Sequence, residues 1–135
     1  MRRTLKTALL GFGHLAPQPA WLIEPDVQEK GDVMCNTVVP EKGAHVLTEF
    51  GRPDLLGQYH SLPHTDQHLL PDFARFTRTL RRRREACVVV VTHDHVLAGG
   101  LDLRQDERFE KGEVRPYLLT ADGKWRRLPV QETDA

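Results

Sequence analysis

The stretch GQYHSLP at residues 57–63 decides how this chain is interpreted, together with the apolar run CVVVVT at residues 87–92. A histidine before a proline turn, then an amphipathic segment, then a valine-rich run is an order used in metal-dependent hydrolysis. A short apolar run rich in β-branched residues is typical of a buried strand. The two stretches therefore predict a histidine at the end of a strand, followed by a helix and a central buried strand.

The segment between these two stretches carries the clearest helix signal. Four apolar residues recur at spacings that place them on one helical face: Leu69, Phe73, Phe76 and Leu80. The opposite side carries three arginines, which are candidates for binding a partner: Arg75, Arg78 and Arg82. Because proline is tolerated in the first turn of a helix, we expect the regular helix to begin at residues 70–71 and to end near residues 83–85.

Strand-like runs occupy much of the remaining chain. They cover residues 20–24, 33–39, 44–50 and 95–103, and a hairpin of residues 114–119 and 124–130 turns at the Asp-Gly pair 122–123. Strands before and after a helix favour the α+β class. We expect one domain over residues 1–135, with a mostly antiparallel mixed sheet and one main amphipathic helix.

Composition restricts the function. A chain of 135 residues with 39% apolar and 28% charged residues is typical of one globular domain. Its 19 basic residues balance its 19 acidic ones, which disfavours nucleic acid and anionic membrane as partners. No run approaches the roughly 20 apolar residues of a membrane span, and the apolar run near the amino terminus is too short for a signal peptide. We therefore expect a cytoplasmic protein.

Three local motifs have simple structural interpretations. GFG at residues 11–13 lacks the third glycine of a dinucleotide loop and predicts a plain turn. The arginine run at residues 81–84 predicts a solvated helix end, with an acidic partner surface as the alternative. Cys35 and Cys87 each lie in an apolar run and are expected to be buried free thiols.

Histidines define the candidate metal sites. Three histidines and an aspartate fall within nine residues: His60, His64, Asp66 and His68. Pro63 prevents His60 and His64 from being helical neighbours, so spacing alone does not fix a ligand geometry. In an extended strand, His93 and His95 would project to the same side, with Cα atoms roughly 6.5–7 Å apart, and could bind one metal. A turn containing these two histidines is the alternative.

The order of these features resembles the JAMM/MPN domain, the fold of zinc-dependent deubiquitinase-like isopeptidases and of their catalytically silent relatives. GQYHSLP is similar to the family's Gly-x-Tyr-His-Ser-His-Pro strand end. Residues 8–13 resemble the early apolar segment, residues 87–94 the central strand, and residues 113–117 the late strand with a tyrosine. The resemblance implies an MPN-like fold, with the layering of cytidine deaminases.

The resemblance also implies that catalysis is lost. Active members place two histidines and an aspartate on zinc, beside a glutamate base and a serine. Only His60 and Pro63 match that pattern. The other four positions carry residues that cannot replace them: Lys6 for the glutamate, Leu62 for the histidine, Leu70 for the serine and Phe73 for the aspartate. The resemblance therefore implies a cofactor-free interaction module that holds a ubiquitin-like or other protein partner within a larger complex.

Two alternatives stay open. The first is a zinc-dependent hydrolase or isopeptidase with a rearranged ligand set built from His60 and residues 64–68. The second is a phage or virion assembly component with an unrelated α+β fold. Each of these interpretations makes a protein partner, or a homo- or hetero-oligomer, part of the function.

Overall fold

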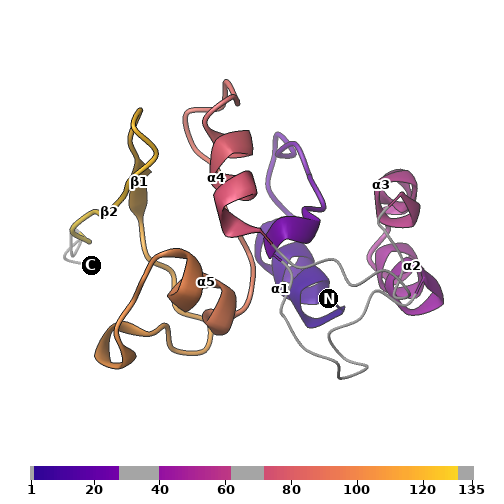
Figure 1. Ribbon diagram of the computed structural model, residues 1–135. Coiled ribbons are helices and arrows are strands. Elements are labelled where there is room, and N and C mark those ends of the chain that lie inside the picture. The colour runs from indigo at the N-terminus through magenta and orange to yellow at the C-terminus, as the bar shows by residue number, and fades with distance from the viewer. Residues whose placement is uncertain (1, 28–39, 62–71, 131–135) are drawn as a thin grey trace.

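The computed structural model describes residues 2–27, 40–61 and 72–130. These residues form an α+β structure in which helices dominate (Figure 1). The helices are α1 (Arg2–Phe12), α2 (Pro40–Glu49), α3 (Leu56–His60), α4 (Phe73–Leu80) and α5 (Asp94–Gly100). Three 3₁₀ turns accompany them: η1 (Pro25–Val27), η2 (Pro53–Leu55) and η3 (Gln105–Glu107). Two antiparallel strands form the hairpin, β1 (Tyr117–Leu119) and β2 (Trp125–Arg127).

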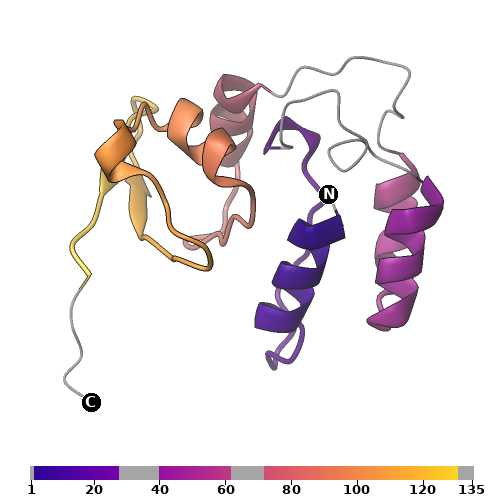
Figure 2. The same cartoon turned by 90° about the horizontal axis from the view of Figure 1, so that it is seen from below.

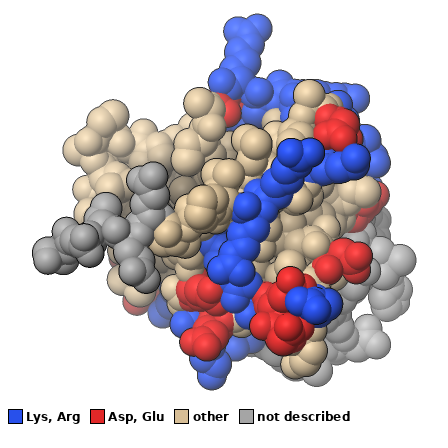
Figure 3. Space-filling view, turned by 90° about the vertical axis from the view of Figure 1, so that its left-hand side faces the viewer, with Lys and Arg blue, Asp and Glu red and all other residues tan. Residues whose placement is uncertain are grey.

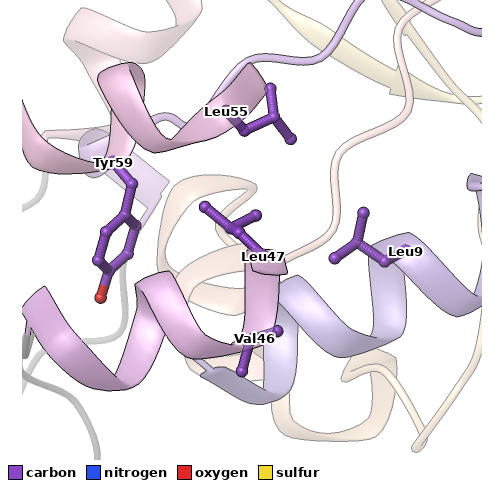
Figure 4. Close-up of a cluster of buried hydrophobic side chains, with 5 residues drawn as sticks. All are labelled: Leu9, Val46, Leu47, Leu55 and Tyr59. Atoms are coloured by element: carbon purple, nitrogen blue, oxygen red, sulfur yellow. The ribbon is translucent and has the colours of Figure 1, made fainter. Parts of the chain in front are cut away.

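The first three helices form one packing group. Their apolar faces meet, together with η2, in a buried cluster (Figure 4) made of Leu9, Val46, Leu47, Leu55 and Tyr59. Burial of such side chains stabilises each by about 1.5–3 kcal/mol. The segment before η1 packs on this cluster, because Gln58 accepts from the Ile23 amide and donates to the Trp21 carbonyl, both at 3.1 Å. The guanidinium of Arg52 lies 4.8 Å above the centre of the Trp21 ring.

The second packing group consists of α4, α5 and the hairpin. The Phe73 ring contacts the rings of Phe76 and Trp125, at centroid distances of 5.5 and 5.9 Å. Trp125 also donates from Nε1 to Thr77 Oγ1 at 3.1 Å, which fixes β2 to α4. Gly100 lets α5 approach Phe73, because a Cβ there would lie 2.3 Å from that ring. The hairpin is thus held by aromatic packing from one helix.

Helix α1 lies between the pair formed by α2 and α3 and the α4–α5–hairpin group (Figures 1 and 2). A side-chain hydrogen bond links it to the second group, since Thr4 Oγ1 lies 3.0 Å from His93 Nε2. Arg75 on α4 binds Asp26 in η1, and Thr92 donates to the Val27 carbonyl. These polar contacts join segments that are far apart in the sequence.

Several predicted strands are wrong. Residues 44–50 lie largely in α2, residues 95–100 of the predicted strand 95–103 lie in α5, and residues 20–24 form no strand. The predicted strand end at residues 57–61 is mostly helical, because Leu55, Leu56 and Tyr59 recur at helical spacing and pack on one core. Among the described residues the predicted mixed sheet reduces to one antiparallel pair, and five helices replace the single expected one.

The predicted central strand at residues 87–92 is also wrong. This segment has no strand partner among the described residues, and Val88 and Val89 are 44% and 57% exposed. Cys87 is exposed instead of buried. Valine favours a strand only where a neighbouring strand accepts its backbone hydrogen bonds. Residues 33–39, which include Cys35, lie outside the described residues.

Two elements were predicted well. The amphipathic helix exists as α4, although it begins at Phe73, where Asp72 caps it by accepting from the Arg75 amide at 2.9 Å, and ends at Leu80 instead of near residues 83–85. The hairpin exists as β1 and β2, with a turn at Gly123, whose φ of 85° suits glycine. Both signals are local in sequence, and packing did not override them.

Candidate functional site

The predicted metal cluster is described only at His60. This residue ends α3 and is exposed, with its ring edge-on to that of Tyr59 at 6.2 Å between centroids. His64, Asp66 and His68 lie outside the described residues. Within residues 2–27, 40–61 and 72–130, no three histidine, cysteine or acidic side chains gather closely enough to hold a metal ion.

Two of the residues that the resemblance sets against catalytic positions of JAMM enzymes have packing roles here. Lys6 Nζ lies 3.5 Å from Glu49 Oε2 and 6.0 Å from the centre of the Phe50 ring, so it joins α1 to the end of α2. Phe73 packs between Phe76 and Trp125. Leu62 and Leu70 lie outside the described residues.

The three candidate arginines have different surroundings, and only Arg75 and Arg78 lie on α4, because the helix ends at Leu80 and Arg82 follows it in a turn. Arg75 donates from Nε to Asp26 Oδ2 at 2.6 Å and from Nη2 to Oδ1 of the same carboxylate. Asp26 is only 5% exposed, and the hydrogen bond to it raises the pKa of Arg75. Such a bidentate pair orients both groups. Arg75 is therefore committed to holding η1 against α4.

The other two arginines are more available. Arg78 Nη2 lies 3.9 Å from Asp72 Oδ2, with more than half of its side chain exposed. Arg82 is exposed and forms no ion pair within the described part of the chain. Sequence periodicity placed all three on one helix, which is wrong for Arg82. It also could not reveal that Asp26 lies beside Arg75.

The His93–His95 segment does not form the expected metal geometry. His93 precedes α5 and contacts Thr4, whereas His95 Nδ1 lies 2.7 Å from Arg108 Nη2. Asp94 accepts from Arg108 and from the Phe109 amide, the latter at 3.1 Å. Because α5 begins at Asp94, the same-side arrangement of an extended strand does not apply. These side chains instead hold the loop after α5.

A buried arginine organises the chain just before β1, and the sequence reasoning missed it. The Arg115 side chain is 9% exposed, forms a bidentate pair with Glu113, and donates to the carbonyls of Glu107 and Arg108. Its guanidinium also lies 4.3 Å from the centre of the Phe109 ring. The hydrogen bond from Arg115 lowers the pKa of Glu113 to about 2. The sequence signal for the role of Arg115 was the alternating charge of the stretch EVR at residues 113–115.

The hairpin presents one face outward. Register pairs Leu118 with Arg126, and the Leu128 amide continues the ladder by donating to the Pro116 carbonyl at 3.0 Å. Side chains alternate between the faces of a sheet, so Leu128 shares the side of Leu118 and Arg126. Leu118 is 49% exposed and Leu128 is 40% exposed. We call Leu118, Arg126 and Leu128 the hairpin face.

Positive charge gathers at the end of the molecule that carries the hairpin. Figure 3 shows the end of the molecule that carries the hairpin, where Lys and Arg side chains run in a row across neutral surface, with acidic side chains along its lower border. Arg127, Leu128, Pro129 and Val130 line a shallow hollow at the end of the hairpin. Arg81 Nη2 donates to the Ala121 carbonyl. The basic end of α4 therefore lies next to the hairpin turn.

The described helices are all too short or too polar to cross a bilayer. No protein-family model, curated protein or solved structure matches the chain.

Proposed function

We propose that this protein is a non-catalytic interaction module that acts within a larger complex by binding an acidic protein surface through the hairpin face. The observation that carries the proposal is the pairing of exposed Leu118 with exposed Arg126 on a hairpin that α4 fixes from behind. A rigid support reduces the entropy lost when a partner binds. Apolar side chains with arginine beside them are typical of binding hot spots.

Charge favours an acidic partner. Lys124 is 3.2 Å from Asp122, but Arg126 forms no ion pair within the described residues. Arg82 is exposed just past the end of α4, next to Arg81, which donates to the hairpin turn. We therefore keep Arg82 in the proposed partner site. The net charge of the whole chain is zero, so the attraction is local. Local attraction of this kind steers association and weakens as salt rises.

The non-catalytic part of the proposal rests on the sequence. A leucine at the second histidine position cannot bind zinc, and Lys6 cannot serve as a carboxylate base. The contact of Lys6 with Glu49 supports a structural role for that position. We place the action of the module in the cytoplasm, which follows from the composition.

We further propose that the α+β fold has an MPN-like layering. It is supported by the order of features, since α4 follows the GQYHSLP stretch and Tyr117 lies on a late strand. The helical position of His60 argues against it. An experimental structure tests it through residues 87–92: strand neighbours from the same chain would support MPN-like layering, and their absence would contradict it.

Site-specific photo-crosslinking tests the hairpin face. We replace Leu118 with p-benzoylphenylalanine in the full chain, expressed in its native host, and use Leu10 as the matched control, since it is 67% exposed on α1. We expect a discrete protein adduct from position 118, absent from position 10. Arg126→Glu should reduce that adduct by about tenfold, the effect of one lost hot-spot contact. Equal adducts at both positions, or none at 118, would contradict the proposal.

A further inference from the structure

The outer edge of strand β2 is open. The Leu128 amide donates to the Pro116 carbonyl at 3.0 Å, and two steps along this ladder the register pairs Leu118 with Arg126. Residue pairs of an antiparallel ladder alternate between those that exchange backbone hydrogen bonds and those that do not. Leu118 and Arg126 therefore exchange them. The residues on either side of Arg126 direct their amides and carbonyls away from β1, and these are Trp125 and Arg127.

These outward groups have no partner in the described part of the chain. Beyond the hairpin ladder, no hydrogen bond between described residues involves the backbone amides or carbonyls of Trp125 and Arg127. No described helix lies beyond β2 in Figures 1 and 2, because Trp125 contacts α4 through its ring instead of its backbone. A strand edge of this kind accepts an extended segment of another chain, which continues the ladder.

Charge distinguishes the β2 edge from the β1 edge. Lys124, Arg126 and Arg127 are all exposed, whereas β1 consists of one tyrosine and two leucines. Like charges that face each other across two strands destabilise the pair, so a second copy of β2 is a poor partner for this edge. Opposite charges stabilise such a pair. The β2 edge therefore selects a strand that carries acidic side chains.

We propose that the acidic partner docks an extended acidic segment antiparallel to β2, a proposal that rests on the proposed function and names its mode of recognition. Trp125 and Arg127 exchange backbone hydrogen bonds with the segment. Arg126 lies opposite a residue that exchanges none, which is the kind of pair whose side chains come closest. An acidic residue there meets Arg126 on the hairpin face. The edge ends at Pro129, which has no amide hydrogen to donate.

A synthetic peptide tests the strand addition on the full chain. The probe is an acetylated and amidated heptapeptide that alternates glutamate and valine and has glutamate at both ends. With a glutamate opposite Arg126, its valines lie opposite Trp125 and Arg127 and direct their backbone groups at β2. At saturation we expect hydrogen exchange of the Trp125 and Arg127 amides to slow by at least about tenfold. The amides of Tyr117 and Leu119, on the opposite edge, should exchange as before.

N-methylation of the peptide separates backbone pairing from attraction by charge. Methylation at the valines removes the amides directed at β2 and should weaken binding by at least about tenfold, the effect of a lost hydrogen bond. Methylation at the glutamates changes amides that point away from β2, so this peptide should bind as well as the unmodified one. Both peptides carry the same charge. A heptapeptide with lysine in place of glutamate should bind at least about tenfold more weakly, because lysine repels Arg126.

A charge reversal in the protein tests the register. Arg126→Glu should weaken binding of the glutamate peptide by at least about tenfold, because it places two acidic side chains opposite each other. Arg3→Glu makes the same change of charge on α1 and should leave the affinity unchanged. Circular dichroism checks that both variants are folded.

Three results would overturn the strand addition. They are binding of the glutamate peptide no tighter than that of the lysine peptide, equal weakening by the two patterns of N-methylation, and equal protection of both hairpin edges. A discrete adduct at Leu118 beside any of these results would leave the proposed function intact. Absence of that adduct, with the peptide results as expected, would overturn the proposed function alone.

Discussion

Gly43 shows how the absence of a side chain sets the distance between two helices. A Cβ at this position in α2 would lie 1.8 Å from Cζ of Tyr59 on α3. The Tyr59 residue is 1% exposed and surrounded by the core, so its ring cannot swing away. The role of Gly43 is to let α2 and α3 pack closely.

We expect Gly43→Ala to lower the free energy of unfolding by about 1–3 kcal/mol, the usual cost of overpacking a core. Gly11→Ala is the control, because nothing lies within 4 Å of a Cβ at that position in α1. Alanine there should stabilise the helix by up to about 1 kcal/mol. Urea unfolding of both variants measures the difference. Equal stability in the two would show that α2 and α3 are not packed as described.

At the scale of elements, the sequence predicted those that depend on local signals. Asp122-Gly123 predicted the hairpin, and the spacing of Phe73, Phe76 and Leu80 predicted α4. It failed where packing decides, as at α3, where Tyr59 turns a supposed strand end into a helix facing α2. The prediction of Arg75 as a partner-binding residue missed its structural role for a similar reason, since Asp26 lies 49 residues from the Arg75 that it binds. No periodicity connects residues so far apart.

The Glu113–Arg115 pair gives the loop before β1 a defined pH response. The Glu113 pKa is lowered from 4.5 to about 2 in the folded chain. Its ionised form therefore contributes order that is fully present above pH 4.5 and is lost as the pH falls towards 2. We expect the Arg115 side-chain NMR signals to stay fixed down to about pH 4 and then move.

Glu113→Gln should abolish this low-pH transition, because a neutral amide does not titrate there. Glu110→Gln, at a neighbouring exposed carboxyl, should retain it. A transition centred near 4.5 in wild type would show that Arg115 does not hold Glu113.

At the scale of the whole molecule, apolar side chains remain exposed in several places among the described residues. Two of these places adjoin α4 and α5: the hairpin face beyond α4, and Val88 and Val89 before α5. Both are fixed to α4 or η1 by hydrogen bonds, through Trp125 and Thr92 respectively. A chain with two supported apolar surfaces is suited to assembly, which agrees with an interaction module.

The assembly interpretation also makes a prediction about metal. We expect untagged protein to contain far less than one zinc per chain by mass spectrometry, because the proposed resemblance sets Leu62 at a ligand position and His60 is exposed at a helix end. His60→Ala should give the same content as wild type. One zinc per chain, lost in His60→Ala, would instead favour the hydrolase and justify assays on ubiquitin-like substrates.

The contact between Trp125 and Thr77 has a practical consequence. The chain has two tryptophans, and they lie in different packing groups, with Trp21 under Arg52 and Trp125 against α4. Replacing either one by phenylalanine leaves a single indole whose fluorescence reports on one group alone. Comparing the two emission curves during denaturation would then reveal whether the halves of this molecule melt together or in sequence.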